Sequence, residues 1–389
     1  MRVLHVSPYF APAFVYGGPP RSVLALCQGL QTAGIEVEVI TTTANGTASL
    51  PESRAGAFDR YDGVPVHYAP RAFPPVFFNA AVAEPISRAL GRADLCHIHG
   101  LWNVPAWVAA RTALRMNVPF VISPRGMLQP AALQQSRWKK RLAFPWIDRK
   151  HLRKAVRVHA TSDDEAAVLS AIVDPSRVFT VPNAVDLSGA EKADAHMRRT
   201  LKIEAGAPLV LFLGRLHPIK RIDLLVEAFT AIVQRRPNAR LVLAGPDEGA
   251  VAPIRSRIER LGDAVVMCGE VNGADKWSLL CEADVLVLCS DSENFGTSVV
   301  EALAAGCPAV VTRTCPWKQL VDHECGFWVE QNARSIADAI ETVVGNPAAR
   351  AAMSAKARRF ARMRFDRTEI GAAMAACYES ALSHQRRVA

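Results

Sequence analysis

The sequence contains no uninterrupted apolar run near the roughly 20 residues that a membrane-spanning helix needs, although half of its 389 residues are hydrophobic. The N-terminal run MRVLHVSPYF meets Pro8 before it reaches the length of a signal-peptide core, and we interpret it as a first strand. The nine cysteines form no C-x-x-C pair and no His/Cys cluster at zinc spacing, which favours reduced thiols. These absences predict a cytoplasmic protein.

Acidic residues are scarce in one part of the chain. Residues 1–185 hold 20 Lys and Arg against 12 Asp and Glu, a net charge of +8, whereas the remainder carries +1 of the total +9. The excess is concentrated in residues 137–157, where Trp138, Phe144 and Trp146 lie among the charges. Such a segment contacts an anionic membrane surface, nucleic acid or a phosphorylated substrate, or it forms a solvated helix face. The aromatics favour a membrane interface. Because no recognised nucleic-acid motif occurs, we expect no nucleic-acid partner.

Short apolar runs alternate with helix-length amphipathic stretches along the whole chain. The runs are mostly continuous, as in strands that are covered on both faces, and the repetition predicts parallel, doubly wound sheets. A polar, small-residue stretch around residues 184–205 interrupts the series. We therefore predict an α/β fold of two tandem Rossmann-like domains that face a cleft, over residues 1–190 and 191–364. The expected strands cover residues 2–7, 37–43, 64–69, 94–99, 119–123, 156–161 and 178–182 in the first domain, and 208–214, 239–245, 264–269, 283–290, 308–312 and 326–329 in the second.

The stretch SDSENFGTSVVEALAAG follows one of these strands, and we expect a helix to begin around Gly296. The start of a helix offers unpaired N–H groups that suit phosphate, Gly296 permits close approach, and Thr297 adds a hydroxyl. Glu293 precedes the helix and Glu301 lies inside it. Glu301 suits the diol of a ribose, but taken alone the two residues also fit a solvated loop acid and a residue favoured by the helix dipole.

Other loops that follow predicted strands carry further candidates. Arg215 and Lys220, in GRLHPIK, can neutralise a diphosphate without a metal, or they are ordinary surface charges. Gly17 and Gly18 lie where a Rossmann-like unit keeps its phosphate turn, and they fit a flexible loop equally well. The pattern is not G-x-G-x-x-G, which disfavours a dinucleotide cofactor. His99 can bind a sugar hydroxyl or serve as a structural hydrogen-bonding group.

Two more candidates are Arg125, in SPRGML, and Asn183, in VPNAVD. Both follow predicted strands, and both also fit ordinary turn chemistry.

Taken together, the elements ENFGT with Glu301, GRL…K, Gly17-Gly18, His99-Gly100 and PNAVD resemble the retaining nucleotide-sugar glycosyltransferases of family 4, which have the GT-B fold. The resemblance covers nearly the whole chain and is strongest over residues 208–306. The stretch SPRGMLQPAAL…SRWKKRLA resembles a bacterial subgroup that builds surface polysaccharides.

The resemblance implies a role for each domain and for each candidate residue. Residues 1–190 would be the acceptor-side domain, residues 191–364 would bind the donor, and the final helix, 365–389, would cross back to the first domain. The implied catalytic residues are His99, Arg215, Lys220 and Glu293. The implied donor-binding residues are Gly17, Gly18, Asn183, Arg215, Lys220, Gly269, Glu270, Val271, Asn294, Phe295, Gly296, Thr297 and Glu301, and Arg125 would meet the acceptor or a phosphate.

The expected activity is transfer of a hexose from a GDP- or UDP-linked donor to a glycan acceptor, and two alternatives stay open. These are a GT-B-shaped nucleotide-sugar epimerase and a non-catalytic nucleotide-sugar-binding protein. We expect no cofactor and no metal, because two cations already face the phosphates. The expected partners are the nucleotide sugar, a lipid-diphosphate-linked acceptor and, through the basic first domain, the inner membrane face.

Overall fold

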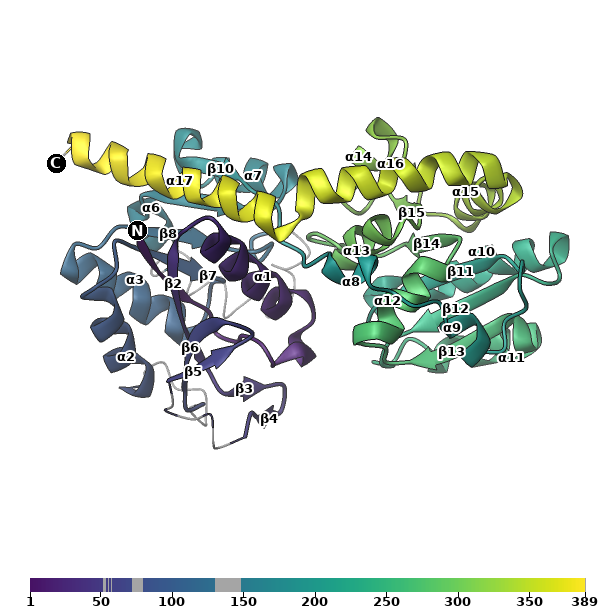
Figure 1. The fold of residues 1–389 in the computed structure, drawn as a ribbon, viewed down its shortest axis with the longest axis horizontal. Helices are drawn as coiled ribbons and strands as arrows, with labels where there is room; N and C mark the ends of the chain where they lie inside the picture. Colours follow the sequence, from purple (N-terminus) through teal and green to yellow (C-terminus); the bar gives the residue numbers. More distant parts are fainter. Residues whose placement is uncertain (52–53, 55, 57, 72–79, 130–147, 389) are drawn as a thin grey trace. The chain divides into compact units, whose positions relative to one another are not determined.

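The computed structural model describes all residues except 52–53, 55, 57, 72–79, 130–147 and 389, and the chain divides into two compact units (Figure 1). Unit 1 comprises Met1–Val185 and Phe365–Ala389, and unit 2 comprises Asp186–Arg364. The sequence places the boundary at residue 190, five residues later. Most of the basic segment 137–157, including its three aromatics, lies outside the described residues.

Unit 1 is built on one eight-stranded sheet with the strand order β10-β9-β8-β7-β1-β2-β6-β5. Seven of these strands were predicted, and these seven are parallel to one another. The bounds are β1 Arg2–Val6, β2 Glu36–Thr42, β5 Phe58–Tyr61, β6 Val64–Ala69, β7 Leu95–His99, β8 Phe120–Ser123, β9 Arg157–Ala160 and β10 Val178–Thr180.

Strand β5 was not predicted, and it runs antiparallel to β6 at the edge of the sheet. The two strands are joined at Asp62 and Gly63, whose φ angles of 47° and 83° are those of a tight hairpin turn. A second short hairpin joins β3, Ala44–Asn45, to β4, Ala48–Ser49. The sheet of unit 1 is therefore mixed, with one antiparallel edge strand.

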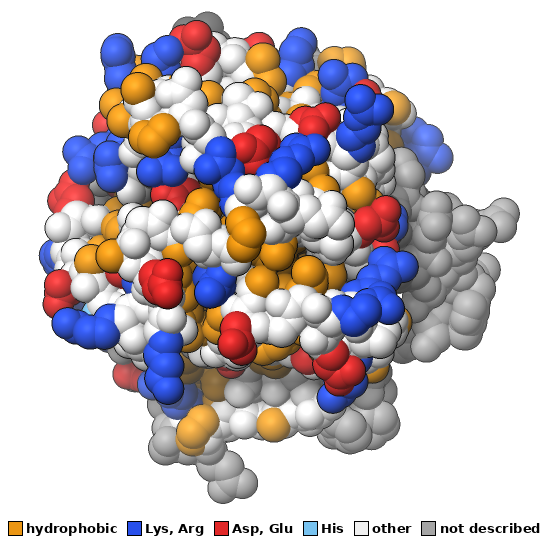
Figure 2. Space-filling view, turned by 90° about the vertical axis from the view of Figure 1, so that its right-hand side faces the viewer, with side chains coloured by type: hydrophobic (Ala, Val, Ile, Leu, Met, Phe, Trp, Pro, Cys, Tyr) orange, Lys and Arg blue, Asp and Glu red, His pale blue; other side chains and the backbone are white. Residues whose placement is uncertain are grey.

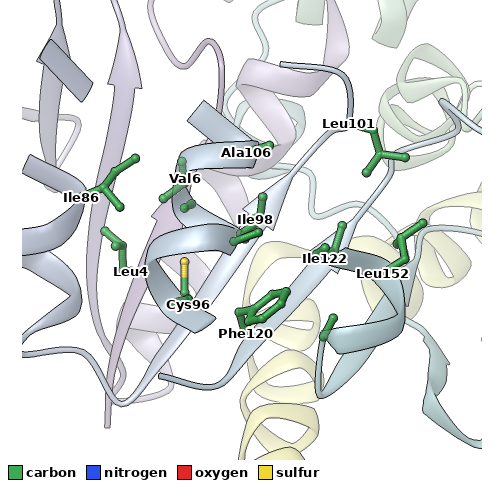
Figure 3. Packing of buried hydrophobic residues seen from close by; sticks show 14 of the residues in the cluster. Leu4, Val6, Ile86, Cys96, Ile98, Leu101, Ala106, Phe120, Ile122 and Leu152 are labelled. Carbon is green, nitrogen blue, oxygen red and sulfur yellow. The ribbon is translucent and has the colours of Figure 1, made fainter. Parts of the chain in front are cut away.

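Alternate residues of these strands pack into two cores. One core, shown in Figure 3, lies under α2 (Ala80–Leu90), α3 (Val104–Met116), α6 (Arg149–Lys154) and α7 (Asp163–Ser170). It receives Leu4, Cys96 and Phe120 from the central strands. The other face is covered by α1 (Gly18–Thr32) and α17 (Arg367–Val388). Its core includes Val3 and Tyr378, and it also holds the histidines described below.

Helix α17 brings the end of the chain back to unit 1. Val185 N–H donates to Phe365 O at 3.0 Å, and Arg367 N–H donates to Val185 O at 3.1 Å. Helix α1 approaches α17 so closely that a Cβ on Gly29 would lie 1.9 Å from Arg367 O, and one on Gly371 would lie 2.1 Å from a backbone carbon of Gly29. Glycine at both positions permits this contact.

Unit 2 contains a six-stranded sheet that is parallel throughout, in the order β13-β12-β11-β14-β15-β16. All six strands were predicted. Their bounds are β11 Leu209–Leu213, β12 Arg240–Ala244, β13 Val265–Gly269, β14 Val285–Leu288, β15 Ala309–Thr312 and β16 Gly326–Val329. The helices of eight or more residues are α10 Ile222–Arg235, α12 Gly273–Glu282, α13 Thr297–Ala305, α15 Ala333–Gly345 and α16 Pro347–Phe365.

The surface in Figure 2 carries Lys and Arg side chains interspersed with Asp and Glu, without an extended patch of one sign. Among the helices that the structure describes, none combines the length and the apolar character needed to cross a membrane.

Candidate functional site

The carboxyl ends of β11 and β14 form the centre of the candidate site in unit 2. These strands are neighbours, but the chain continues from β11 to β12 on one side and from β14 to β15 on the other. Such a reversal of strand order is where open α/β sheets bind ligands. Arg215 and Lys220 follow β11, and Glu293 follows β14. The topology therefore brings three of the predicted residues to one edge of the sheet.

Lys220 and Glu293 form an ion pair between Nζ and Oε2. The side chains retain 16% and 17% of their exposure, so the pair is largely shielded from solvent. Arg215 is more exposed, and its Nη1 donates to Glu248 Oε2 at 2.8 Å. Both predicted cations are thus paired with carboxylates, and an incoming diphosphate would compete with these partners.

Gly296 begins α13 as the sequence predicts. Its φ of 77° is left-handed, and a Cβ there would lie 3.1 Å from atoms of Leu288 and Trp317, so glycine is favoured on two grounds. Trp317 Nε1 donates to Phe295 O at 2.6 Å and fixes the turn before the helix. Asn294 and Thr297 flank this turn. The turn presents the first N–H groups of α13 beside the Lys220–Glu293 pair.

Glu301 lies inside α13 and is mostly buried. Lys276 Nζ, from α12, donates to its Oε1 at 2.7 Å, and the two side chains are 14% and 10% exposed. Lys276 was not identified from the sequence, because nothing in its spacing relates it to a glutamate 25 residues later. The buried ion pair holds Glu301 in a defined position.

The predicted base-contacting residues Gly269, Glu270 and Val271 lie at the end of β13. Gly269 has a φ of 72°, and its carbonyl accepts a hydrogen bond from Gly245 N–H at 2.7 Å. Glu270 Oε1 accepts a hydrogen bond from Asn272 Nδ2 at 3.1 Å.

Unit 1 has its own reversal of strand order, between β1 and β7. The loop after β1 contains Gly17, with a φ of 79°, and leads into α1, which begins at Gly18. His99 ends β7. Arg125 follows β8, the neighbour of β7, and Asn183 follows β10 at the edge of the sheet. Four of these residues lie at the carboxyl edge of the sheet as predicted, and Gly18 starts the helix that covers it.

Arg125 connects the predicted residues of unit 1 by direct hydrogen bonds. Its Nε donates to His99 Nδ1 at 3.2 Å, and its Nη1 donates to Asn183 Oδ1 at 2.7 Å and to Ser22 Oγ at 3.0 Å. His99 is 1% exposed, and its other ring nitrogen lies 3.0 Å from His5 Nδ1. A sugar hydroxyl would have to replace one of these two partners to bind His99, whose contact with a sugar stays a prediction.

Four buried histidines share the face of the sheet under α1 and α17. His5 lies in register with His97, and His99 and His159 project from the same face of β7 and β9. Burial lowers the pKa of His5 and of His159 to about 3, and it lowers the pKa values of His97 and His99 well below their ordinary value. Sequence analysis identified only His99, because the other three lie inside apolar runs.

The hydrogen bonds of His99 fix how its ring is protonated. A guanidinium can only donate, so His99 Nδ1 is an acceptor and the ring proton is on Nε2, where it points to His5 Nδ1. His5, His97 and His99 bring ring nitrogens within 4.8 Å of one another, a spacing that can suit a metal. In this arrangement, however, both nitrogens of His99 are already used. We therefore interpret the group as a hydrogen-bond network of neutral imidazoles.

The predicted site residues thus form one group in unit 2 and another in unit 1. Each group is defined within its own unit, and the roles assigned from the sequence stay predictions. Three residues that sequence reasoning missed, Lys276, His5 and Ser22, hold predicted residues in place.

Comparison with known proteins gives matches to both units. The family described as glycosyl transferases group 1 matches residues 194–360, and a glycosyl transferase 4-like domain matches residues 17–184. A D-inositol 3-phosphate glycosyltransferase from Kineococcus radiotolerans is 30% identical, over 92% of this chain and 89% of its own.

Two solved structures share the fold. Anabaena HepE in complex with UDP and glucose has a TM-score of 0.74 at 21% identity, covering 98% of this chain and 100% of its own. WaaG, a glycosyltransferase involved in lipopolysaccharide biosynthesis, has a TM-score of 0.66 at 18% identity, covering 95% and 97%.

Proposed function

The chain belongs to the family-4 type glycosyltransferases with the GT-B fold, and from that premise we propose that it is a retaining hexosyltransferase. The donor would be a GDP- or UDP-linked hexose and the acceptor a glycan. The observation that carries this proposal is the Lys220–Glu293 pair beside the start of α13, at the strand reversal of unit 2. The start of a helix, whose N–H groups suit phosphate, lies there together with a cation and a carboxylate.

Different residues of unit 2 would contact different parts of the donor. Arg215 and Lys220 bind the diphosphate and stabilise the charge that develops as it departs. The backbone at Phe295, Gly296 and Thr297 contacts phosphate and sugar. Support for a uridine diphosphate comes from HepE, whose structure contains UDP and glucose.

Glu301 is proposed to bind the ribose. Lys276 donates a hydrogen bond to its Oε1. Its Oε2 accepts no hydrogen bond from the described residues, and it is not fully buried. That oxygen is therefore available to accept from the 2′- and 3′-hydroxyls.

Transfer with retention requires attack on the face from which the diphosphate leaves. The acceptor oxygen bonds to the anomeric carbon while the bond from that carbon to the diphosphate oxygen breaks, and a phosphate oxygen takes the acceptor's proton. Glu293, paired with Lys220, positions the donor sugar and is not a covalent nucleophile. A glycosidase-type mechanism needs two carboxyls placed about the bond, whereas the partner of Glu293 is a cation. Neither a metal nor a cofactor has a role in this scheme.

The proposed acceptor is a lipid-diphosphate-linked glycan of a bacterial surface polysaccharide, presented at the inner membrane face. The net charge of +8 on residues 1–185 supports this, because basic surfaces bind anionic lipids. Co-sedimentation with vesicles that contain anionic lipid, compared with neutral vesicles, tests the membrane part. Equal recovery from both vesicles would remove it.

The activity is tested with a panel of nucleotide sugars. A donor that binds the folded protein raises its melting temperature, and the selected donor is then incubated with and without glycan acceptors. We expect a glycosylated product with the donor's anomeric configuration. Conversion of the donor without an acceptor would indicate an epimerase, and binding without turnover a non-catalytic protein.

Variants test the assigned residues. Lys220→Ala and Glu293→Ala are each expected to abolish transfer while circular dichroism shows an intact fold. Lys318→Ala, at an exposed residue between α13 and β16 that forms no ion pair with the described residues, serves as a matched control for loss of a lysine in the same unit. Normal turnover in either test variant would contradict the site.

A further inference from the structure

The loop that carries Arg125 is held in a strained conformation. Arg125 has a φ of 54°, in the left-handed region that non-glycine residues rarely adopt. The next residue, Gly126, donates its N–H to Glu165 Oε1 at 2.5 Å. Glu165 is 1% exposed, and its other oxygen accepts from Thr161 N at 2.8 Å and Thr161 Oγ1 at 2.7 Å. A buried carboxylate thus fixes the backbone that aims Arg125.

The guanidinium of Arg125 has only neutral partners. His99, Ser22 and Asn183 accept three of its hydrogen bonds, and no carboxylate lies within ion-pair distance of it among the residues that the structure describes. Every site cation of unit 2 has such a partner: Arg215, Lys220 and Lys276 pair with carboxylates.

One edge of the guanidinium is still available. Nη2 has no hydrogen-bond partner in the described part of the chain, and it is not fully buried. Nε and Nη1 are both held, so the plane of the guanidinium is fixed while Nη2 stays in contact with solvent. A fixed, partly shielded guanidinium edge is suited to binding an oxyanion.

The histidines determine this orientation. Because His99 accepts from Arg125, its own proton must point to His5, which accepts it on Nδ1. His5 therefore selects the tautomer of His99 that can hold Arg125. Nothing in the sequence motifs identifies His5 for this role.

We propose that Arg125 binds a phosphate or carboxylate group of the acceptor through Nη2, and that His5, His99 and Glu165 are positioning residues for it. The statement that this anion belongs to the acceptor rests on the proposed function, whereas the anion site itself does not. The site lies at the strand reversal of unit 1, where a ligand of that unit is expected. It is made entirely of residues from unit 1.

The anion site is tested first without turnover. The full chain carrying Arg215→Gln and Lys220→Gln, which weakens phosphate binding in unit 2, is titrated with inorganic phosphate against chloride at matched ionic strength. We expect phosphate to raise the melting temperature, and we expect added Arg125→Gln to abolish the rise. Acetate, titrated in parallel, separates carboxylate from phosphate. Failure of both anions to raise the melting temperature, or a rise that persists after Arg125→Gln, would overturn the proposal.

Two variants of His5 separate positioning from folding. In His5→Gln the amide oxygen can still accept the proton of His99, whereas His5→Leu removes the acceptor. We expect the leucine variant to lose about tenfold in anion affinity and the glutamine variant to lose little, with His99 ring shifts in NMR spectra reporting the tautomer. If the two variants bound the anion equally well and His99 kept its wild-type tautomer in both, the role of His5 would be contradicted.

Kinetics then identify the carrier of the anion. Arg125→Gln is expected to raise the acceptor KM at least tenfold and to leave the nucleotide-sugar KM unchanged, and Arg115→Gln, an exposed charge on α3, serves as the matched control. A change confined to the donor KM would refute the acceptor assignment. If the chain transferred no hexose, the phosphate titration would still decide the anion site.

Discussion

Acidification is expected to unfold unit 1 well before unit 2, because four histidines are buried in unit 1 in the neutral form. Burial holds the pKa of His5 and of His159 at about 3 and keeps those of His97 and His99 well below the ordinary value of 6.5. In the unfolded chain these histidines titrate normally. The unfolded state therefore takes up protons as the pH falls through 6.5, and the folded state does not.

The sign and size of the effect follow from this difference. A base whose pKa is lowered by folding contributes its full stability above pH 6.5 and loses it progressively as the pH falls toward the folded pKa. Between pH 7.5 and 5.5 each histidine is expected to cost about 1.4 kcal/mol, or roughly 5 kcal/mol for the four. That is comparable with the whole stability of many domains, about 5–15 kcal/mol.

No other group near the cluster titrates in this interval. Arg125 stays cationic, because burial lowers its pKa only to about 10. Tyr378 and Cys27 stay neutral, since burial raises both pKa values. Carboxylates generally titrate lower, so an experiment above pH 5.5 reports on histidines. His67 and His151, elsewhere in unit 1, also have pKa values that burial lowers, and they add to the uptake of the four.

The assay is hydrogen exchange in urea at several pH values, corrected for the intrinsic exchange rate, with peptides from β1, β7 and β9 reporting unit 1 and peptides from β11 and β14 serving as the internal control. We expect the unit 1 peptides to show an uptake of about four protons or more on unfolding near pH 5.5. His159→Gln, which can still donate to Val181 O in place of the imidazole, should reduce this by about one proton. An uptake below two protons would mean that the folded state accommodates charged histidines, and the reasoning would fail.

Three further predictions concern single contacts. Gly371→Ala places a methyl 2.1 Å from a backbone carbon of α1, so thermal unfolding should show a loss of at least about 2 kcal/mol, and a wild-type melting temperature would contradict the close approach. Lys276→Met leaves the carboxylate of Glu301 buried without a cation. We expect the free energy of unfolding to fall by about 2 kcal/mol and calorimetry to show weaker nucleotide binding. Unchanged binding would mean that Glu301 does not contact the nucleotide. Glu248→Gln frees Arg215 and should tighten donor binding about 1.4- to fivefold, since exposed pairs contribute roughly 0.2–1 kcal/mol. Weaker binding in this last variant would indicate that Glu248 itself contacts the donor.

Strand positions were predictable because both sheets are largely parallel and buried. A run such as VLVL in β14 stands out, since each of its residues must be apolar. The edge strand β5, FDRY, alternates between exposed and partly buried positions and contains two charges, so its short pattern resembles a loop. The prediction failed at this strand because it is short and polar and lies at the edge of the sheet.

Site residues were predictable where they follow a strand and unpredictable where they depend on strand order. Lys220 and Glu293 lie in loops after β11 and β14, so the general rule for α/β sheets identified them. His5 is different, because its importance arises from the pairing of β1 with β7, which sets it in register with His97 and beside His99. No local pattern contains that information.

The site cations of the two units have different partners, and this difference suggests how each unit binds its ligand. In unit 2, Lys220 pairs with Glu293. Under the proposed function, a bound diphosphate would take the place of Glu293 beside Lys220 and release that carboxylate toward the donor sugar. Donor binding and placement of that carboxylate would then be one event. In unit 1, Arg125 is held by neutral groups and needs no exchange. An anion there would gain the whole charge-assisted interaction without displacing a competitor, which suits recognition of a substrate that is not itself cleaved.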